Sequence, residues 1–546
     1  MGKNPINSRQ LKTLITINPA HGVIWIIVIT MIIRLFIAGI TGLYNGESYY
    51  TLSVLNPQLS YFDQPPLAFW TGWASVNLFG SFNAFTLRLP FILFFAGTTW
   101  LLFLLGRKLF DDRAGFYAAL LLNLSAVFTA TSATWLQPDG PLLLFWLATA
   151  LCLAHIFFKT FADEQEKMNW RWSGECWLLW VLTGLFLGLT TLSKYHAVFL
   201  FAGAGIFLVC SRKYRFWFWH PGLYLALLIN FAIASPIFIW NYHNGWVSFL
   251  FQMGRAGVGS ELSFHFDWFL RSIGGQALWL LPWIWFPLIW QLVVCLYKGP
   301  KDSERWFCAC TAILPIFFFT IITLWTNTGF HFHWQAPGYL MLFLPLGKVV
   351  AVFMDKGGKY KFWTKNLLIA SGAVCFFIFV VLQVHAATGF WNNYGPKWFA
   401  SKFGETLDPT MEGFDYDILP ELFEKKGWLE DPNVFVATTR WYEAGKVGWA
   451  LRGKKKVLCL DSDPRNVFYL YDQRQLLGHD AVLITRQKDN FIKNNTRIFE
   501  KVKRLPDLPI IRSGVEEMTF KVYYCKNMRY PYSYPKKYRK KVNDLR

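Results

Sequence analysis

Long uninterrupted blocks of apolar residues constrain this chain more than any other feature. Two of them, VIWIIVITMIIRLFIAGI near the N-terminus and LLIASGAVCFFIFVVLQV in the second half, each approach the length of about 20 residues that crosses the hydrocarbon core of a bilayer. Charged residues make up only 16% of the sequence, whereas a soluble domain carries about 25%. The sequence therefore predicts a polytopic α-helical membrane protein.

The apolar blocks number about eleven when each is counted as one span. The first, Val23 to Ile40, is longer than the core of a signal peptide and has no small-residue cleavage site, so we expect a retained anchor. A break is expected in the long block at 268–297, at Pro282 or Pro287. The expected spans are 22–40, 88–106, 114–131, 141–158, 176–192, 195–210, 221–240, 268–297, 306–325, 336–354 and 366–386.

Basic residues are distributed unevenly among the loops between these spans. The N-terminal segment and every second loop carry three or four Lys or Arg each, while the alternate loops contain only Lys194 and Arg255 once the span-boundary residues Arg88 and Arg271 are set aside. Because cytoplasmic loops are rich in Lys and Arg, the N-terminus is predicted to be cytoplasmic. An odd number of spans then places everything after about residue 387 outside. The formal net charge of +20 thus has a topological explanation and predicts no nucleic-acid partner.

The C-terminal part, Gly389 to Arg546, has the composition of a soluble domain. The stretch NVFVATTRWYEAGKVGWAL is typical of a strand followed by a helix, and KKVLCLD, AVLIT and TFKVYYC are short β runs. We expect a transmembrane module at 1–386 and a small extracytoplasmic α/β domain at 387–546. Two questions stay open: whether Cys459 and Cys525 pair or are free thiols, and whether the basic tail YPKKYRKKVNDLR binds anionic lipid or is solvated.

Polar side chains that can carry chemistry gather in the loops predicted to face outward. The first of these loops contributes Glu47 and Asp63, the second contributes Asp139, and later ones contribute Lys194 and Arg255. A carboxylate can serve as a general base, and Lys or Arg can neutralise a phosphate. This distribution is what an enzyme acting on a phosphorylated lipid requires.

Each of these residues also has a structural explanation. Acids at membrane ends are often solvated, Asp139 could cap the helix that follows it, and Lys194 could snorkel from the junction of two spans. His331 and His333 resemble a fragment of a metal site, but i,i+2 spacing in a loop is a weak signal, and no metal ligand is assigned.

The motifs in these loops resemble those of bacterial membrane glycosyltransferases related to protein O-mannosyltransferases, with aminoarabinose transferases as more distant relatives. The first loop, GESYYTLSVLNPQLSYFDQPPLAFW, is similar to the family's first-loop signature. The resemblance continues in order, over most of residues 22–350, through RLPFILFFAGTTWLLFLLGRKLFDDRAGFYAALLL, QPDGPLLLFW, LSKYHAVFLF, NGWVSFLFQMGRA and HFHWQAPGYL. Together these motifs indicate the family but no particular substrate.

The resemblance implies a GT-C fold, a multi-span helical bundle whose large first outer loop forms the roof of the active site. It implies a sugar donor carried on a polyprenyl phosphate and inverting transfer to a hydroxyl of a lipid, polysaccharide or protein at the periplasmic face of a bacterial inner membrane. Hexosyl and pentosyl transfer both fit. The implied partners are the lipid-linked donor, the acceptor and membrane lipids. No cofactor is certain, although a divalent cation is compatible with this chemistry.

The sequence departs from the family pattern at two positions. The family's first-loop acid is replaced by Gly46, which leaves Glu47, and the basic residue of the Tyr-Phe-Asp-x-Pro-Pro motif is Gln64. A missing general base costs about 10² to 10⁴ in rate. Three explanations are open: transfer has been lost, the donor or acceptor differs, or another acid serves as the base. The candidates are Glu47, ranked first because it adjoins the lost position, Asp63 and Asp139.

Residue-by-residue carry-over assigns the remaining roles. Asp139 matches the second-loop acid, while Lys194 and, by weaker alignment, Arg255 match donor-phosphate residues. Substrate contacts are assigned to the tyrosines and histidines of these loops, although the tyrosines also suit an interfacial belt. This substrate-binding set comprises Tyr49, Tyr50, Tyr61, His331 and His333.

Two other functions remain as alternatives. A non-catalytic protein that binds or moves lipid-linked sugars is suggested by the changes at Gly46 and Gln64. An ion channel or secondary transporter is disfavoured, because the spans contain few ionisable groups, of which Arg34 is one.

Overall fold

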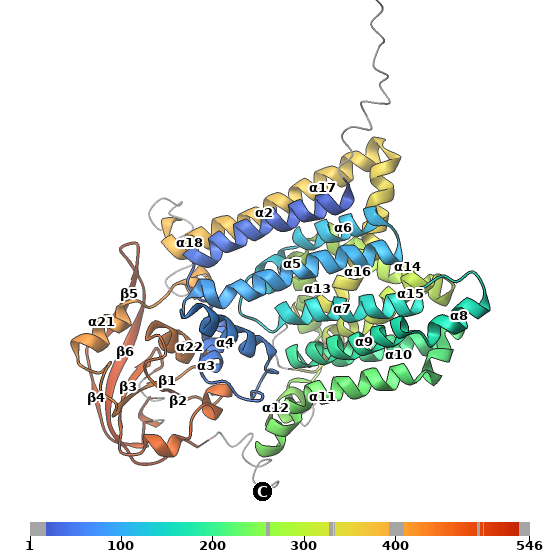
Figure 1. The fold of residues 1–546 in the computed structure, drawn as a ribbon. Coiled ribbons are helices and arrows are strands. Elements are labelled where there is room, and N and C mark those ends of the chain that lie inside the picture. Colours follow the sequence, from blue (N-terminus) through green and yellow to red (C-terminus); the bar gives the residue numbers. More distant parts are fainter. Residues whose placement is uncertain are drawn as a thin grey trace, which may run out of the picture.

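A computed structural model describes residues 18–257, 263–326, 331, 333–391, 409–488, 492–494 and 496–533. Eight long apolar helices form a bundle, and most coincide with the expected spans (Figure 1). They are α2 (Pro19–Ile40), α5 (Ala84–Leu109), α7 (Asp139–Phe157), α9 (Gly174–Ser193), α11 (Pro221–His243), α15 (Ser303–Ile321) with η4 (Ile322–Leu324), α16 (Ala336–Lys356), and α17 (Gly358–Phe376) continuing through η5 (Phe377–Val381) and α18 (Leu382–Thr388).

Two further expected spans are bent. The pair α10 (Ala197–Cys210) and η2 (Arg212–Trp219) bends by 117°, and the pair α13 (Phe266–Leu280) and α14 (Pro282–Lys298) bends by 112°. The second bend confirms the predicted break at Pro282, where Leu281 takes a positive φ of 70°. The block expected at 114–131 contains only α6 (Asp112–Asn123), 12 residues long, and the π-helical turn η1 (Phe128–Ser132). Counting the bent pairs gives up to ten spans in the described chain, against about eleven expected.

Small residues allow the helices of the bundle to approach closely. A Cβ placed on Gly106 of α5 would lie 2.5 Å from the Cα of Gly115 in α6. Such contacts are common where membrane helices pack, since apolar burial drives little association inside a bilayer. Side-chain caps set where helices begin: Asn83 accepts from the third amide of α5 and Asp111 from that of α6.

The C-terminal domain is an α/β fold, as expected from its sequence. Its sheet has the strand order β2-β1-β3-β6-β4, and β5 also pairs with β6. Strands β1, β2 and β3 are parallel, with Val436 opposite both Val457 and Val482, whereas β6 is antiparallel to its neighbours. Cys459 and Cys525 are both buried and free. The strands are β1 (Val434–Thr438), β2 (Val457–Cys459), β3 (Asp480–Thr485), β4 (Phe499–Arg504), β5 (Leu508–Arg512) and β6 (Val515–Met528).

Short helices complete the structure. The loop after α2 contains α3 (Asn45–Leu55) and α4 (Leu67–Phe79), and α12 (Val247–Arg255) follows α11. The C-terminal domain adds α22 (Trp441–Ala450), which connects β1 to β2, and the turn η7 (Arg465–Tyr469). The remaining elements are α8 (Glu164–Arg171), η3 (Gly299–Lys301), η6 (Pro409–Gly413), α21 (Ile418–Lys425) and η8 (Gln473–Leu476).

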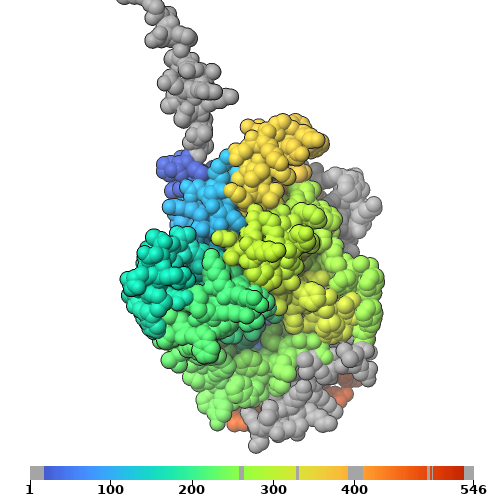
Figure 2. Space-filling view, turned by 90° about the vertical axis from the view of Figure 1, so that its right-hand side faces the viewer, coloured from blue at the N-terminus to red at the C-terminus, as the bar shows by residue number. Residues whose placement is uncertain are grey.

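The C-terminal domain sits at one end of the bundle and packs on the first loop (Figure 1). In the view from the opposite end, the bundle hides almost all of it (Figure 2). Helix α22 lies against α3 so closely that a Cβ on Gly445 would come within 2.3 Å of the Tyr49 amide nitrogen. Tyr49 and Leu52 of α3 belong to the same hydrophobic core as Val447 of α22. The first loop therefore shares a core with the domain expected at 387–546.

Candidate active site

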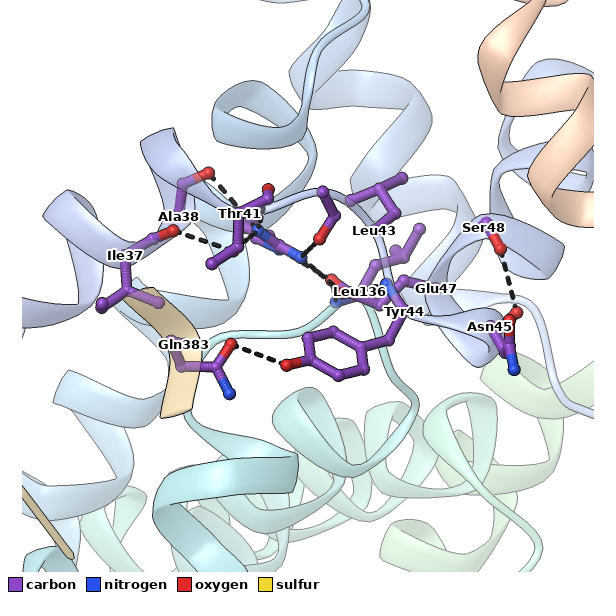
Figure 3. A network of polar contacts seen from close by, with 12 residues as sticks. Ile37, Ala38, Thr41, Leu43, Tyr44, Asn45, Glu47, Ser48, Leu136 and Gln383 are labelled. Atoms are coloured by element: carbon purple, nitrogen blue, oxygen red, sulfur yellow. Dashed lines mark hydrogen bonds and ion pairs between the residues drawn. The ribbon is translucent and has the colours of Figure 1, made fainter. Parts of the chain in front are cut away.

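Glu47, the acid next to Gly46, lies in the first turn of α3 and forms a buried ion pair with Arg88 of α5. Arg88 donates from Nε to Oε1 at 2.9 Å and from Nη2 to Oε2 at 2.6 Å, and both side chains are fully buried. The carboxylate also accepts from the backbone amides of Leu136 at 3.1 Å and Tyr44 at 3.2 Å (Figure 3). Both oxygens of Glu47 are thus engaged twice.

Arg88 extends this network to the end of α2. Its guanidinium donates to the hydroxyl of Thr41 at 2.7 Å and to the backbone oxygens of Thr41 and Gly42 at 3.0 and 2.8 Å. Figure 3 shows Thr41, Glu47 and Leu136 close together in this network. The ion pair therefore connects α2, α3, α5 and the loop before α7, and its contacts favour a structural role for Glu47.

Gly46, which stands where the family pattern has an acid, faces the segment just before α7. A Cβ at this position would have Gln137 Nε2 at 3.9 Å as its nearest neighbour, with no other atom within 4 Å. The backbone therefore leaves space for a side chain directed toward the segment that carries Asp139.

Asp63 is 4% exposed and lies on the loop between α3 and α4. The hydroxyl of Tyr49 donates to its Oδ2 at 3.1 Å, and Gln252 of α12 donates to its backbone oxygen at 2.9 Å. Burial raises the pKa of the Asp63 carboxyl, while the positive charges of Arg465 and Arg255 act to lower it. A buried carboxylate with a raised pKa, beside two arginines, has the environment expected of a general base.

Asp139 and Lys194 form a second buried ion pair. Lys194 Nζ lies 2.9 Å from each oxygen of Asp139, and the two side chains are 6% and 2% exposed. Asp139 is the first residue of α7, and its side chain makes no capping hydrogen bond, because Pro138 occupies the cap position. Lys194 directly follows α9 and is buried, so it does not snorkel to the solvent. The capping and snorkelling interpretations of these two residues are wrong.

Arg255 ends α12 and packs on aromatic rings. Its guanidinium carbon lies 4.7 Å from the centre of the Trp334 ring and 5.3 Å from that of Phe251. Trp334 also contacts His331, with ring centres 4.8 Å apart, and the rings of His331 and His333 are 5.6 Å apart. Within the residues the structure describes, no three His, Cys, Asp or Glu side chains gather as a metal site would need.

The three candidate tyrosines occupy different environments. The side chain of Tyr61 is fully buried and bonds within its own loop, accepting from the Gln58 amide and donating to the Ser53 oxygen, which favours a structural role. Tyr49 is buried beside Asp63. Burial raises the pKa of the partly exposed Tyr50, and Asp63, Asp139, Arg255 and Arg465 all act on it electrostatically.

Tyr50 therefore marks the place where the predicted groups converge. Asp63, the Asp139–Lys194 pair and Arg255 come together around it, at the end of the bundle where α3 packs against α22. His331 and His333 border this group, because their charges interact with those of Lys194 and Arg255. Glu47 lies apart, in its own ion pair.

Sequence reasoning missed Arg465. This residue begins η7 in the C-terminal domain, some 400 positions after the first loop, and acts electrostatically on Asp63 and Tyr50. The signal that could have indicated it is the polar run DSDPR directly after the β run KKVLCLD. Ligands bind beyond the carboxyl ends of parallel strands in α/β folds, so the loop after this β run was a candidate binding site.

Comparisons with known proteins find similar sequences and a similar fold. Residues 63–240 match the family described as dolichyl-phosphate-mannose-protein mannosyltransferase. The chain is 24% identical over 316 residues to the undecaprenyl phosphate-alpha-4-amino-4-deoxy-L-arabinose arabinosyl transferase 2 of Proteus mirabilis, covering 56% of this chain and 52% of that protein. The chain thus matches about half the length of this curated relative.

The fold is similar to that of two solved structures of ArnT from Cupriavidus metallidurans. The structure bound to undecaprenyl phosphate aligns with a TM-score of 0.60 at 13% identity, over 92% of this chain and 97% of that one. The apo structure aligns with a TM-score of 0.59 at 14% identity, over 92% and 98%. The matched segment, the curated relative and this fold make the chain similar to membrane glycosyltransferases of the GT-C superfamily.

Proposed function

We propose that this membrane protein transfers a sugar from a polyprenyl-phosphate donor to a hydroxyl of a cell-envelope acceptor. The observation that carries the proposal is the convergence of Asp63, the Asp139–Lys194 pair and Arg255 at the outer end of the bundle. The names of the relatives support a lipid-linked donor: the curated relative is an undecaprenyl-phosphate-dependent transferase, and the ArnT structure holds undecaprenyl phosphate.

Asp63 is the proposed general base. It accepts the proton of the acceptor hydroxyl as the hydroxyl oxygen attacks the anomeric carbon. The bond from that carbon to the phosphate oxygen breaks, and both of its electrons leave with the polyprenyl phosphate. A single displacement of this kind inverts the anomeric configuration. The Tyr49 hydroxyl, 3.1 Å from Oδ2, orients the carboxylate.

Lys194 and Arg255 are the proposed phosphate-binding groups. As the phosphate leaves, its negative charge increases, and preorganised cations stabilise the transition state more than the ground state. Asp139 holds Lys194 in position through two bonds of 2.9 Å. Glu47 is assigned a positioning role, because Arg88 and two backbone amides already occupy its oxygens.

Transfer on the outer side of a bacterial inner membrane, with a cytoplasmic N-terminus and a periplasmic C-terminal domain, is part of this proposal. It is supported by the concentration of basic residues in alternate loops and by the bacterial relatives. Lipids, polysaccharides and proteins remain candidate acceptors, and both hexoses and pentoses remain candidate sugars.

The test is a turnover assay with purified protein in nanodiscs. A panel of polyprenyl-phosphate sugars is supplied with acceptor, and release of free polyprenyl phosphate is measured. Asp63→Asn is expected to lower turnover by about 10² to 10⁴. Asp267→Asn is the matched control, because Asp267 is exposed and its ion pair among the described residues is a long one, 3.9 Å from Arg271. Normal turnover by Asp63→Asn would show that another group is the base.

The second candidate function is binding or movement of lipid-linked sugars without transfer, and Gly46 and Gln64 are the observations that favour it. A protein that binds the donors but releases no polyprenyl phosphate with any acceptor would support this alternative.

A further inference from the structure

Asn466 of the C-terminal domain is hydrogen-bonded to residues that surround the candidate base. Its backbone amide donates to the Tyr49 hydroxyl at 2.9 Å, and that hydroxyl donates to Asp63. The Asn466 side chain accepts from the Phe62 amide at 3.0 Å and donates to the Ser53 hydroxyl at 3.0 Å. The three bonds made by Asn466 hold η7 against α3 and the loop that carries Asp63, and the first residue of η7, Arg465, acts electrostatically on Asp63.

Arg465 is held in this place at a conformational cost. Its φ is 48°, in the left-handed region that costs a residue with a side chain about 1 kcal/mol and costs glycine almost nothing. Its guanidinium carbon lies 3.9 Å from the centre of the Trp441 ring, and Nε is 3.3 Å from Asp463. Stacking and the ion pair fix the plane of the guanidinium, and a side chain retained at a strained backbone position points to a function.

The electrostatic environment of Arg465 suggests what that function is. The charge of Arg465 acts on Asp63, Tyr49 and Tyr50, the groups nearest the proposed reaction. It also acts on Arg255: burial lowers the pKa of the Arg255 guanidinium, and Arg465 lowers it further. Two arginines from separate parts of the chain are thus held near one another, and their repulsion is relieved when an anion binds between them.

We propose that Arg465 of the C-terminal domain, together with Arg255 of α12, binds the phosphate group of the lipid-linked donor. The inference rests on the proposed function for the identity of the ligand, and it adds a residue and a domain to the site. The bundle would supply Lys194 and Arg255, and the C-terminal domain would complete the phosphate site from above.

The chemistry of the side chain suits this role. A guanidinium carries five N–H donors in a planar fork that matches the oxygens of a phosphate. Within the described chain, the only hydrogen bond of the Arg465 side chain is from Nε to Asp463, which leaves both Nη groups as donors. Because the phosphate gains charge as its bond to the sugar breaks, Arg465 would assist both donor binding and departure of the leaving group.

The experiment compares Arg465→Gly with Arg452→Gly. Glycine suits the left-handed backbone at both positions, so neither variant should lose stability through its backbone. Arg452 is a matched control, because it lies in the same domain, has a φ of 51° and stacks on Trp449 at 4.2 Å, at a site where its charge acts on Asp417. Binding of undecaprenyl phosphate to protein in nanodiscs is measured, with inorganic phosphate as a competitor.

Arg465→Gly is expected to weaken undecaprenyl phosphate binding at least tenfold, with the melting temperature of the ligand-free protein unchanged, while Arg452→Gly binds as the wild type does. Competition by inorganic phosphate alone would show that the phosphate, without its lipid, is sufficient for binding. An affinity of Arg465→Gly within twofold of wild type would overturn the inference. So would a variant that binds normally and differs only in its pH–rate profile, since Arg465 would then act through Asp63.

The outcome is separable from that of the proposed function. If the wild type binds undecaprenyl phosphate, Arg465→Gly does not, and no donor is turned over, the phosphate site stands and sugar transfer fails. If the wild type turns over a donor and Arg465→Gly binds normally, transfer stands and the role of Arg465 fails.

Discussion

The two buried ion pairs, Glu47–Arg88 and Asp139–Lys194, differ in how completely their charged groups are hydrogen-bonded. In the Glu47–Arg88 pair, the guanidinium also binds Thr41 and Gly42, and the carboxylate also accepts from two backbone amides. In the Asp139–Lys194 pair, both bonds of the ammonium go to the one carboxylate. An ammonium has three donors, so in the described structure Lys194 keeps one for a ligand.

The number of unused donors distinguishes a structural ion pair from a catalytic one more clearly than burial or charge does. Both pairs are buried, and all four residues carry charge, so neither property distinguishes them. An ion pair whose donors and acceptors are all engaged within the protein serves to hold helices together. A pair with a remaining donor, close to Arg255 and Asp63, can accept a phosphate without losing its own partner. Substitutions in the two pairs test this distinction.

Glu47→Gln should destabilise the protein strongly. The substitution leaves the guanidinium of Arg88 buried without a counter-charge, which costs about 3–5 kcal/mol in the free energy of unfolding. Thermal unfolding in detergent measures it, and Glu164→Gln is the control, because that exposed residue pairs only with Lys167 at the surface and should change stability by less than about 0.5 kcal/mol. A Glu47→Gln protein with normal stability and no turnover would make Glu47 the base and reverse the comparison.

Lys194→Met should instead act mainly on catalysis. Loss of one charge-stabilising donor lowers turnover by about 10² to 10³. The stability loss should be smaller than for Glu47→Gln, because the stranded Asp139 can take up a proton whereas Arg88 cannot release one. Turnover of polyprenyl-phosphate donors and melting temperature are measured on the same preparation. If Lys194→Met unfolds as readily as Glu47→Gln does, the two pairs have the same role.

The sequence indicated the candidate residues better than it indicated which of them contact one another. Asp63, Asp139, Lys194 and Arg255 were found because each lies in a loop on the side with few basic residues. Arg88 was set aside as a span-boundary residue, because a linear sequence does not reveal which groups donate hydrogen bonds to Glu47. Adjacency to Gly46 gave Glu47 a rank that its contacts do not favour.

The missed residue has a different cause. Arg465 reaches Asp63 only because α22 packs on α3, with Gly445 against Tyr49. Neither that helix contact nor a left-handed arginine can be inferred from periodicity. The expected fold classes of both domains agree with the structure because hydropathy and strand patterns are local. The expectation of about eleven spans differs at 114–131, where the apolar residues continue past a short α6 and are buried by neighbouring protein.

The pH dependence of turnover sharpens the assignment of Asp63. A general base must be deprotonated, so activity falls as the pH decreases through its pKa. Since burial raises the pKa of Asp63 above its usual range, near 4, the acid limb of kcat/KM should lie above that of an ordinary carboxylate. Arg465→Gly removes a charge that lowers this pKa, so it should move the limb to higher pH, whereas Arg452→Gly should not. An acid limb at or below pH 4 in the wild type would argue against Asp63.

Gly46→Asp should give the smallest change in stability and tests whether the missing acid can be replaced. The position faces Gln137 with no closer neighbour, and it lies in the first turn of α3, where a negative charge stabilises a helix by about 0.3–1 kcal/mol. In the Asp63→Asn background, Gly46→Asp should recover turnover at least tenfold if the new carboxylate, directed toward the segment that carries Asp139, reaches the acceptor. Gly174→Asp is the matched control: Gly174 also begins a helix with open space around it, but far along the chain from the site, at the start of α9.

Recovery by Gly46→Asp and not by Gly174→Asp would mean that the catalytic acid of this site can stand either on α3, at position 46, or on the following loop, at Asp63. Failure to recover, in a protein that still binds undecaprenyl phosphate, would mean that the position of the acceptor has changed along with the base.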